Sequence, residues 1–579
     1  MVPASQPGIG GSGPPGLVAG RARARRAPAL ALAVAGAAAF CFSLWITRDQ
    51  ALFSDEWGRY LLYPSMSFGA TLHGLSGHLV VGHVFLYRAV FELFGAGSYL
   101  PLRLIQATLL VACAVLFYLY LGDRVSPWPA VGAAVVLMFL GSAWEVVATP
   151  YGIVILLPIA LGLAALNCLL RPGLGWEIGA CALLTAAVFT QDFALPFLAG
   201  ALVLTGVRRS PPSLRSGWVA GVPLLLYAAW FAWSRLDTSY SFVGDPVKLS
   251  NLAKVPSTVL SLCAVGATSA AGTFESHGVL DLATGFFLLA LIAVLAASGR
   301  PRLRGTVSAL VWVPVAMMLA FGFLVGLALG GDRAPTAIRY VYLATLLVLM
   351  FCLELLGRRR GPLAAACVVA LLALGVVANA TAYRRIGRQI AQIGIENRAV
   401  LGALDVAGAA ADPGYEIASE PTRFEINNVR GFTAGQYRSA ASRFGSPSLS
   451  PAEAALPPEA RAAADRTLIA SEGIAPLPVA APAAAPSSAC SNLAGAPGAP
   501  ATAIRALRPG AALEVQASGS GSGVVVAARR FASSPQAIGT VPAGTAARVS
   551  SPRDDSPVPW RLSFATDGAA LVCPLAAQG

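Results

Sequence analysis

Long apolar runs with few or no charges are the feature that most constrains this chain. The first covers residues 29–46, and ten more follow at 102–121, 129–145, 151–170, 176–190, 193–207, 217–234, 279–298, 306–330, 338–356 and 362–382. About 20 apolar residues are enough to cross a bilayer as a helix. Hydrophobic residues make up 56% of the sequence and charged residues 12%, which is unlike a soluble globular protein. The pattern predicts an all-α polytopic membrane bundle of about eleven transmembrane helices.

Two of these runs, 176–190 and 193–207, are shorter than a perpendicular span requires. We interpret them as a hairpin with Gln191 and Asp192 at its tip. A carboxylate placed in lipid costs about 3 kcal/mol, so we expect Asp192 to face a cavity or the aqueous rim. We expect the same outer cavity to be lined by Trp144, Glu145 and Tyr151.

The arginines predict the orientation, because short cytoplasmic loops carry an excess of Lys and Arg. Arginine clusters at 21–26, 208–215, 300–304 and 358–360 all fall on one side of an eleven-span bundle. The N-terminus is then cytoplasmic, and the loops at 47–101, 235–278 and 331–337 and everything after 383 are extracytoplasmic. This placement accounts for much of the net charge of +13, so the charge is no argument for a nucleic-acid partner. A signal peptide is the alternative interpretation of the first run.

Composition divides the rest of the chain. Residues 1–28 are expected to form a disordered basic N-terminus, 29–383 the membrane domain, 384–475 a helical and irregular extracytoplasmic region, and 476–500 an Ala/Pro-rich linker. From 501 to 579, short alternating runs separated by turn residues predict a small β-sandwich. Cys490 and Cys573 bracket this last part, and in an oxidising exterior they are expected to form a disulfide, with two free thiols as the alternative.

An acid pair, Asp55 and Glu56, follows the first apolar run within the stretch SDEW. The outer loop that it opens also contains His73, His78, His83 and Arg88. The segment from 77 to 106 is typical of interfacial amphipathic helices that lead into the next span. Polar chemistry is thus concentrated at one membrane face.

Several stretches resemble the GT-C superfamily of polytopic glycosyltransferases, which use polyprenyl-phosphate sugars. SDEW resembles the acidic motif of their first outer loop, and AIRYVYL at 337–343 resembles an Arg-Tyr motif that opens a late span. GSAWEVVATPYGIVILLPIALGLAAL resembles a segment of a largely uncharacterised group of actinobacterial membrane proteins. The resemblance covers roughly residues 30–380. It implies transfer of a sugar from a polyprenyl-phosphate donor to an envelope glycan or lipid acceptor at the outer face of the cell membrane.

Such a transfer needs a base for the acceptor proton and cations for the departing phosphate. Asp55 is the candidate base, with Glu56 assisting it or binding a divalent cation. Arg339 and Arg333 are candidate phosphate ligands, because a guanidinium engages two oxygens at once. Asp192, His78, His83 and Arg88 are further candidate substrate-binding residues. His78 and His83 lie five residues apart, a spacing that does not favour a metal site on one helical face.

Two other functions fit the same sequence. A transporter or flippase of a lipid-linked envelope precursor would need polar residues along a path through the bilayer, whereas the intramembrane charges here gather at the outer face. The acid pair is also Asp-Glu where the more familiar pair is Asp-Asp. That departure leaves open a catalytically inactive GT-C-like scaffold.

Overall fold

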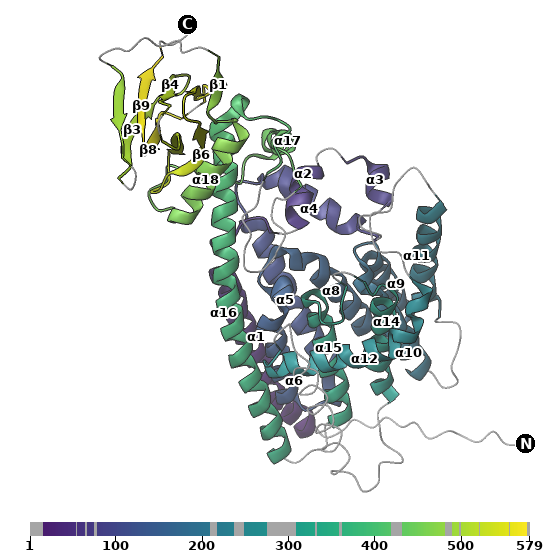
Figure 1. Ribbon diagram of the computed structural model, residues 1–579. Coiled ribbons are helices and arrows are strands. Elements are labelled where there is room, and N and C mark those ends of the chain that lie inside the picture. The colour runs from purple at the N-terminus through teal and green to yellow at the C-terminus, as the bar shows by residue number, and fades with distance from the viewer. Residues whose placement is uncertain are drawn as a thin grey trace, which may run out of the picture. The chain divides into compact units, whose positions relative to one another are not determined.

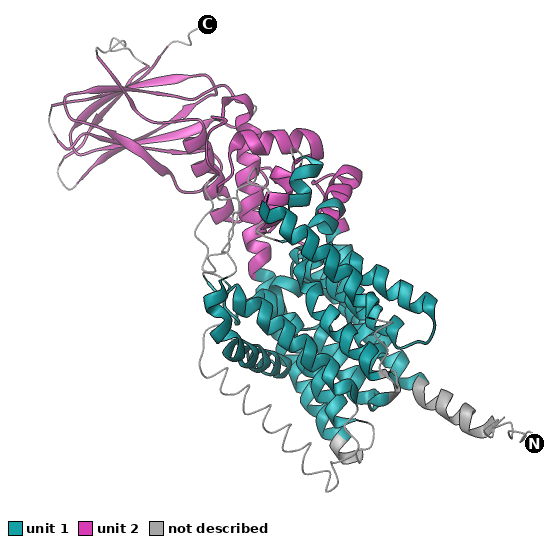
Figure 2. Cartoon of the chain, turned by 90° about the vertical axis from the view of Figure 1, so that its right-hand side faces the viewer, with its two compact units in different colours: residues 1–47, 67–85, 102–388 teal, residues 48–66, 86–101, 389–579 magenta. Residues whose placement is uncertain are grey.

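A computed structural model describes residues 15–53, 55–63, 66–73, 78–208, 217–236, 248–274, 309–330, 333–357, 362–417, 431–480, 489–496, 499–519, 521–554 and 556–575. The described chain is mostly helical and ends in β-strands (Figure 1). It divides into two compact units, coloured separately in Figure 2. Unit 1 comprises residues 1–47, 67–85 and 102–388, and unit 2 comprises residues 48–66, 86–101 and 389–579.

Unit 1 is a bundle of apolar helices. Its helices are α1 (Pro15–Ile46), α3 (Phe68–His73), η1 (Gly122–Arg124), α6 (Pro127–Met138), η2 (Gly141–Ala143), α7 (Trp144–Val147), η3 (Pro150–Gly152), α8 (Ile153–Leu169), α9 (Leu174–Val188), η4 (Asp192–Ala194), α10 (Leu195–Arg208), α11 (Trp218–Leu236), η6 (Leu249–Lys254), α12 (Val255–Ala271), η7 (Ala309–Val311), α14 (Trp312–Leu327) and α15 (Ile338–Leu356). Three helices contribute residues to both units, namely α4 (Val81–Phe94), α5 (Leu100–Leu121) and α16 (Pro362–Ala407).

Nine helices in the described ranges are long and apolar enough to cross a membrane. They are Arg26–Ile46, Leu100–Leu121, Pro127–Val147, Pro150–Leu169, Trp218–Leu236, Leu249–Ala271, Ala309–Leu327, Ile338–Leu356 and the apolar part of Ala365–Ala410. Leu174–Val188 and Asp192–Val207 are shorter apolar helices at the two runs interpreted as a hairpin. The multi-pass character predicted from the sequence is therefore confirmed, whereas the run 279–298 lies outside the described residues.

One helix of unit 1 contradicts the sequence prediction. Residues 249–271, expected within an outer loop, form η6 and α12. The Lys248 backbone N–H donates to Leu327 O at 3.2 Å, so the start of this helical segment lies beside the end of α14. Lysines at its start and several Ser and Thr residues make it the least apolar of the nine long helices. These polar residues explain why the apolar pattern did not reveal it.

Buried side-chain amides and hydroxyls connect the helices of unit 1. Asn379 on α16 accepts hydrogen bonds from Ser142 N at 3.1 Å and Ser142 Oγ at 3.0 Å, and its amide donates to Ser269 O at 2.8 Å. Gln106 on α5 donates to Val147 O at 2.8 Å. Polar groups in an apolar interior are costly unless they are hydrogen-bonded, so these residues fix which helices are neighbours.

Unit 2 combines helices with two antiparallel sheets. Its helices are α2 (Asp55–Leu62), η8 (Gly408–Ala410), α17 (Ala434–Phe444) and α18 (Pro458–Ser471), and its strands are β1 (Leu477–Val479), β2 (Ser491–Ala494), β3 (Ala501–Leu507), β4 (Ala512–Ala517), β5 (Val524–Arg529), β6 (Gln536–Val541), β7 (Ala546–Ser550), β8 (Trp560–Thr566) and β9 (Ala569–Pro574). The strand orders are β1-β7-β4-β9-β2 and β3-β8-β5-β6. Every pairing is antiparallel.

Two strands, β1 and β2, lie within residues 476–500, where the sequence predicts a linker. Both strands are so short that the alternation of apolar and polar residues gives little signal. Their partners, β7 and β9, lie much later in the chain. The predicted disulfide between Cys490 and Cys573 is present. It joins the residue just before β2 to β9, and the two strands are hydrogen-bonded neighbours.

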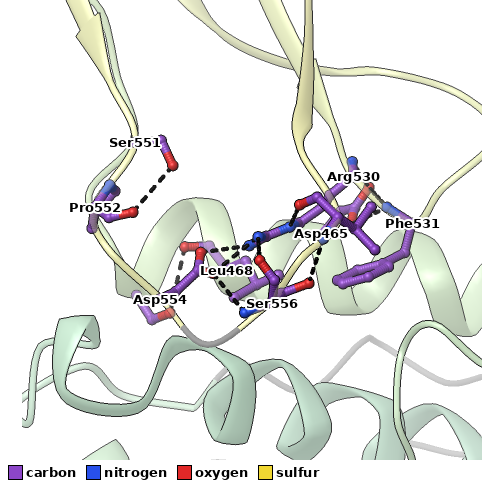
Figure 3. A network of polar contacts seen from close by, with 10 residues as sticks. Asp465, Leu468, Arg530, Phe531, Ser551, Pro552, Asp554 and Ser556 are labelled. Carbon is purple, nitrogen blue, oxygen red and sulfur yellow. Dashed lines mark hydrogen bonds and ion pairs between the residues drawn. The ribbon is translucent and has the colours of Figure 1, made fainter. Parts of the chain in front are cut away.

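A buried ionic network attaches α18 to the strands (Figure 3). Arg530 donates two hydrogen bonds to Asp554, at 2.5 and 2.9 Å, and both side chains are fully buried. Asp465 on α18 accepts hydrogen bonds from the backbone N–H groups of Arg530, Phe531 and Ala532. Burial raises the pKa of Asp465, and these backbone donors oppose the rise. The network holds the segment after β5 against α18.

Candidate functional site

The two acids of the SDEW stretch have opposite environments in unit 2. Asp55 is exposed in the first turn of α2, and within the described residues it makes no hydrogen bond. Glu56, the next residue, is fully buried. Its carboxylate accepts hydrogen bonds from Tyr87 Oη at 2.9 Å, from Tyr99 Oη and from Phe53 N at 2.9 Å. Asp55 is therefore accessible to a ligand, whereas Glu56 is enclosed by its hydrogen-bond donors.

The bond to Phe53 is half of a reciprocal pair. Glu56 N donates to Phe53 O at 3.0 Å while Phe53 N donates to the Glu56 side chain. A Glu side chain that accepts a hydrogen bond from a backbone N–H three residues earlier satisfies a donor near the helix start, as the Glu of a capping box does. The two hydrogen bonds between Phe53 and Glu56 fix the start of the helix that carries Asp55. Glu56 thus holds the turn that presents Asp55, and its expected assistance to Asp55 or binding of a divalent cation stays a prediction.

Burial raises the pKa of Glu56 to about 7. The hydrogen bond from Tyr99, the positive charge of Arg59 and the hydrogen bond from Tyr87 oppose this rise. Arg59 lies over the Tyr87 ring, 4.9 Å from its centroid. A carboxyl group this deeply enclosed cannot reach a substrate without displacing both tyrosines, which supports its structural role.

Unit 1 brings together two candidate residues that are far apart in the sequence. His78 Nδ1 lies 2.7 Å from Asp192 Oδ2, and the two side chains are 34% and 23% exposed. His78 precedes α4, and Asp192 begins η4 between the two short apolar helices. That Asp192 faces a cavity or the aqueous rim stays a prediction.

The remaining outer-loop candidates divide between the units. His83 is 2% exposed, and its Nδ1 lies 3.1 Å from Thr190 O, so it packs the start of α4 against the hairpin tip. His73 is also buried, with its ring 4.3 Å from that of Trp233. Arg88, in unit 2, lies 4.0 Å from Glu92, a residue that Arg443 also contacts. His73, His83 and Arg88 thus contact other parts of the protein. Among the described residues, no group of three or more His, Cys, Asp or Glu residues is suited to hold a metal.

Arg339 and Arg333 lie in unit 1, half-buried at and before the first turn of α15. Next to Arg339, Tyr340 belongs to a cluster of three rings with Phe193 and Phe321, whose centroids lie 5.8 to 6.2 Å apart. Phe193 is the residue after Asp192. The ring cluster therefore joins the segment that carries Arg339 to the segment that carries Asp192.

The other residues expected at the outer cavity lie in consecutive short helices. Trp144 is buried and Glu145 is half-buried in α7, and Tyr151 is half-buried in η3. Thr149, between them, donates its hydroxyl proton to Glu145 O at 2.7 Å. These contacts fold the 144–152 segment tightly.

No family model, curated protein or solved structure matches this chain.

Proposed function

We propose that the chain is a membrane glycosyltransferase of the GT-C kind, which moves a sugar from a polyprenyl-phosphate donor to an extracytoplasmic cell-envelope acceptor. One observation in unit 1 supports this proposal most strongly. His78 and Asp192 meet directly, and the Phe193–Phe321–Tyr340 ring cluster ties their neighbourhood to the helix start that carries Arg339. Three segments that supply predicted substrate-binding residues thus converge.

In this proposal Arg339, with Arg333 nearby in sequence, binds the donor phosphate, because a guanidinium offers two parallel donors to phosphate oxygens. Asp55 supplies an exposed carboxylate as the base for the acceptor hydroxyl, and Glu56 holds the turn that presents it. A divalent cation would have only the Asp55 carboxylate to bind at this turn, since the Glu56 oxygens are already occupied.

The proposal includes the membrane arrangement. The arginine clusters support a cytoplasmic N-terminus, and the disulfide of unit 2 supports an oxidising exterior for that unit. We also propose that the two sheets pack face to face as a sandwich. Buried residues that face each other on neighbouring strands, Val515 with Val572 in one sheet and Val526 with Phe564 in the other, support that packing.

The transporter alternative gains no support from the bundle. A transport path would need polar side chains with free hydrogen-bonding capacity. Buried polar side chains of the described helices, such as Asn379, Gln106 and Tyr383, are instead hydrogen-bonded to neighbouring helical segments. The inactive-scaffold alternative is decided by experiment.

The test measures transfer from a radiolabelled polyprenyl-phosphate sugar by the full chain in nanodiscs. Asp55→Asn should reduce transfer by about 10²- to 10⁴-fold, the usual worth of a general base, and leave donor binding intact. Arg339→Ala should weaken donor binding as well as turnover, because it removes a charged contact present before and during the reaction. Asp49→Asn and Arg171→Ala, changes at exposed charges, are the matched controls.

Two results would contradict the proposal. If deleting the chain removes an envelope sugar and an Asp55→Asn copy restores it fully, the protein acts as a scaffold or its base lies elsewhere. If the parental chain neither binds nor consumes any polyprenyl-phosphate sugar, the transferase assignment fails.

A further inference from the structure

The His78–Asp192 pair leaves one hydrogen-bonding atom on each partner directed away from the contact. A separation of 2.7 Å is the length of a charge-assisted hydrogen bond, so Nδ1 carries the proton that Asp192 Oδ2 accepts. Nε2 is then the imidazole atom that meets whatever binds there. Asp192 Oδ1 is buried and has no hydrogen-bond partner in the described part of the chain. The Tyr227 hydroxyl on α11 lies close enough to interact with the Asp192 carboxylate, but it makes no hydrogen bond of normal geometry to Oδ1.

The backbone around the pair is held rigidly. Gly82 N donates to Phe189 O at 2.8 Å, and the Gln191 side chain accepts a hydrogen bond from Asp192 N at 3.2 Å. A Cβ at Gly82 would lie 2.7 Å from Thr190 Oγ1, so this close approach of the two segments requires glycine. The pair is therefore preorganised before any ligand arrives, which lowers the cost of binding.

The unsatisfied carboxylate oxygen selects among ligand classes. A buried acceptor without a donor is costly, and a ligand that donates to Oδ1 recovers this cost. The phosphodiester of a polyprenyl-phosphate sugar has no proton to give at neutral pH, and a phosphate of either kind is negatively charged and is repelled by the carboxylate. A sugar hydroxyl can donate to Oδ1, and a neighbouring hydroxyl can exchange a hydrogen bond with His78 Nε2. The partial exposure of both side chains allows such a ligand to enter.

We infer that His78 and Asp192 form a subsite for the hydroxyl groups of a sugar, separate from the arginines that would hold the donor phosphate. This inference rests on the proposed transferase function, and it names the part of a substrate that the pair would bind. His78 contacts the ligand, and Asp192 both orients the imidazole and accepts one hydroxyl. The subsite recognises the polyhydroxy part of a substrate, not its lipid phosphate.

Selective acylation of histidine by diethylpyrocarbonate tests this inference in the full chain. The chain has four histidines, and peptide mass spectrometry can follow each one. In phosphatidylcholine nanodiscs, which contain no glycoside detergent, His78 should react faster than the buried His73 and His83. Heptyl glycosides of common pentoses and hexoses should slow the reaction at His78 at least fivefold, whereas heptanol and farnesyl phosphate should not.

Asp192→Asn supplies the variant. It keeps the shape but replaces a charged acceptor with a neutral one, so His78 reactivity should fall about fivefold and glycoside protection should disappear. His83, which contacts the same hairpin, should react as in the parental chain, and this readout shows that the local fold survives. If Asp192→Asn accelerates His83 acylation, Gln191→Ala replaces it as the probe, and this variant should lower glycoside protection without removing it.

The outcomes separate the two proposals. Protection of His78 by farnesyl phosphate but by no glycoside would overturn the subsite in favour of a phosphate contact. The absence of protection by every glycoside would also overturn it. Glycoside protection in a chain that transfers no sugar would leave the subsite standing and remove the transferase function instead.

Discussion

The carboxylate of Glu56 in unit 2 and that of Asp192 in unit 1 show two ways in which a protein can handle an acid near a helix start. Glu56 is fully buried, and both of its oxygens receive hydrogen bonds. Asp192 is partly exposed, bonded through one oxygen and unsatisfied at the other. A completed set of donors marks an acid that shapes the fold, whereas an incomplete set marks one with capacity left for a ligand.

We expect the largest effect on stability when a fully buried acid loses its partner. Arg530→Met removes the partner of Asp554 and leaves a buried carboxylate without its cation. Loss of one member of a buried pair costs about 3–5 kcal/mol, so unit 2 should unfold at much lower urea concentration. Pulse proteolysis of the full chain measures this change. Arg561→Met, at an exposed position on β8, is the matched control and should change stability by less than about 0.5 kcal/mol. Equal effects of the two variants would show that the network adds nothing.

A smaller effect should appear as a pH dependence through Glu56. Its pKa of about 7 lies above the unfolded value of 4.5, so the folded state binds more protons between these two values. Stability from this group is complete below pH 4.5 and is lost as pH rises toward 7, by up to about 3 kcal/mol. Glu56→Gln, which cannot ionise, should remove that component from urea titrations of unit 2. Parallel pH profiles for the parental chain and the variant would mean that Glu56 is ionised in the fold.

Glu472, also in unit 2, complicates the profile but not the comparison. Burial and the nearby Asp554 charge together raise its pKa to about 8, and the positive charge of Arg530 opposes this rise. Its contribution has the same sign over a wider pH range, and it is present in both chains. The difference between the parental chain and Glu56→Gln therefore isolates Glu56.

The smallest effects should come from the open acids. Asp55→Asn and Asp192→Asn change an exposed and a partly exposed carboxylate, so each should alter the unfolding free energy by no more than about 1 kcal/mol. Their effects on transfer and on His78 acylation should nevertheless be large. A loss of several kcal/mol for Asp192→Asn would place that residue with the fully buried acids and contradict the comparison.

The sequence predicts those parts of the fold in which local pattern dominates. The runs with few or no charges locate most of the apolar helices, and the location of Cys490 and Cys573 in the part expected outside the cell predicts their bond. The helix at 249–271 is missed because Ser, Thr and Lys dilute its apolar pattern, while packing against other helices stabilises it. Short strands such as β1 and β2 depend on partners that come much later in the chain.

The candidate site is harder to predict because it depends on contacts between remote segments. His78 and Asp192 lie 114 residues apart, and no local signal couples them. The roles of Asp55 and Glu56 depend on Tyr87 and Tyr99, which the sequence does not place near them. The aromatic residues that follow Glu56 in α2 are the one local sign that this helix has a buried side.

The strand order of unit 2 has a consequence for biosynthesis. β9, the last strand, lies between β4 and β2 in the five-stranded sheet, and it carries one half of the disulfide. Until β9 emerges from the ribosome, β4 has a strand partner only on its β7 side, β2 has none in this sheet, and the Cys490–Cys573 bond cannot form. The sheet can therefore close only after β9 has been synthesised. The unpaired edges of β4 and β2 are the surfaces that a chaperone or protease would meet on every copy that lacks β9.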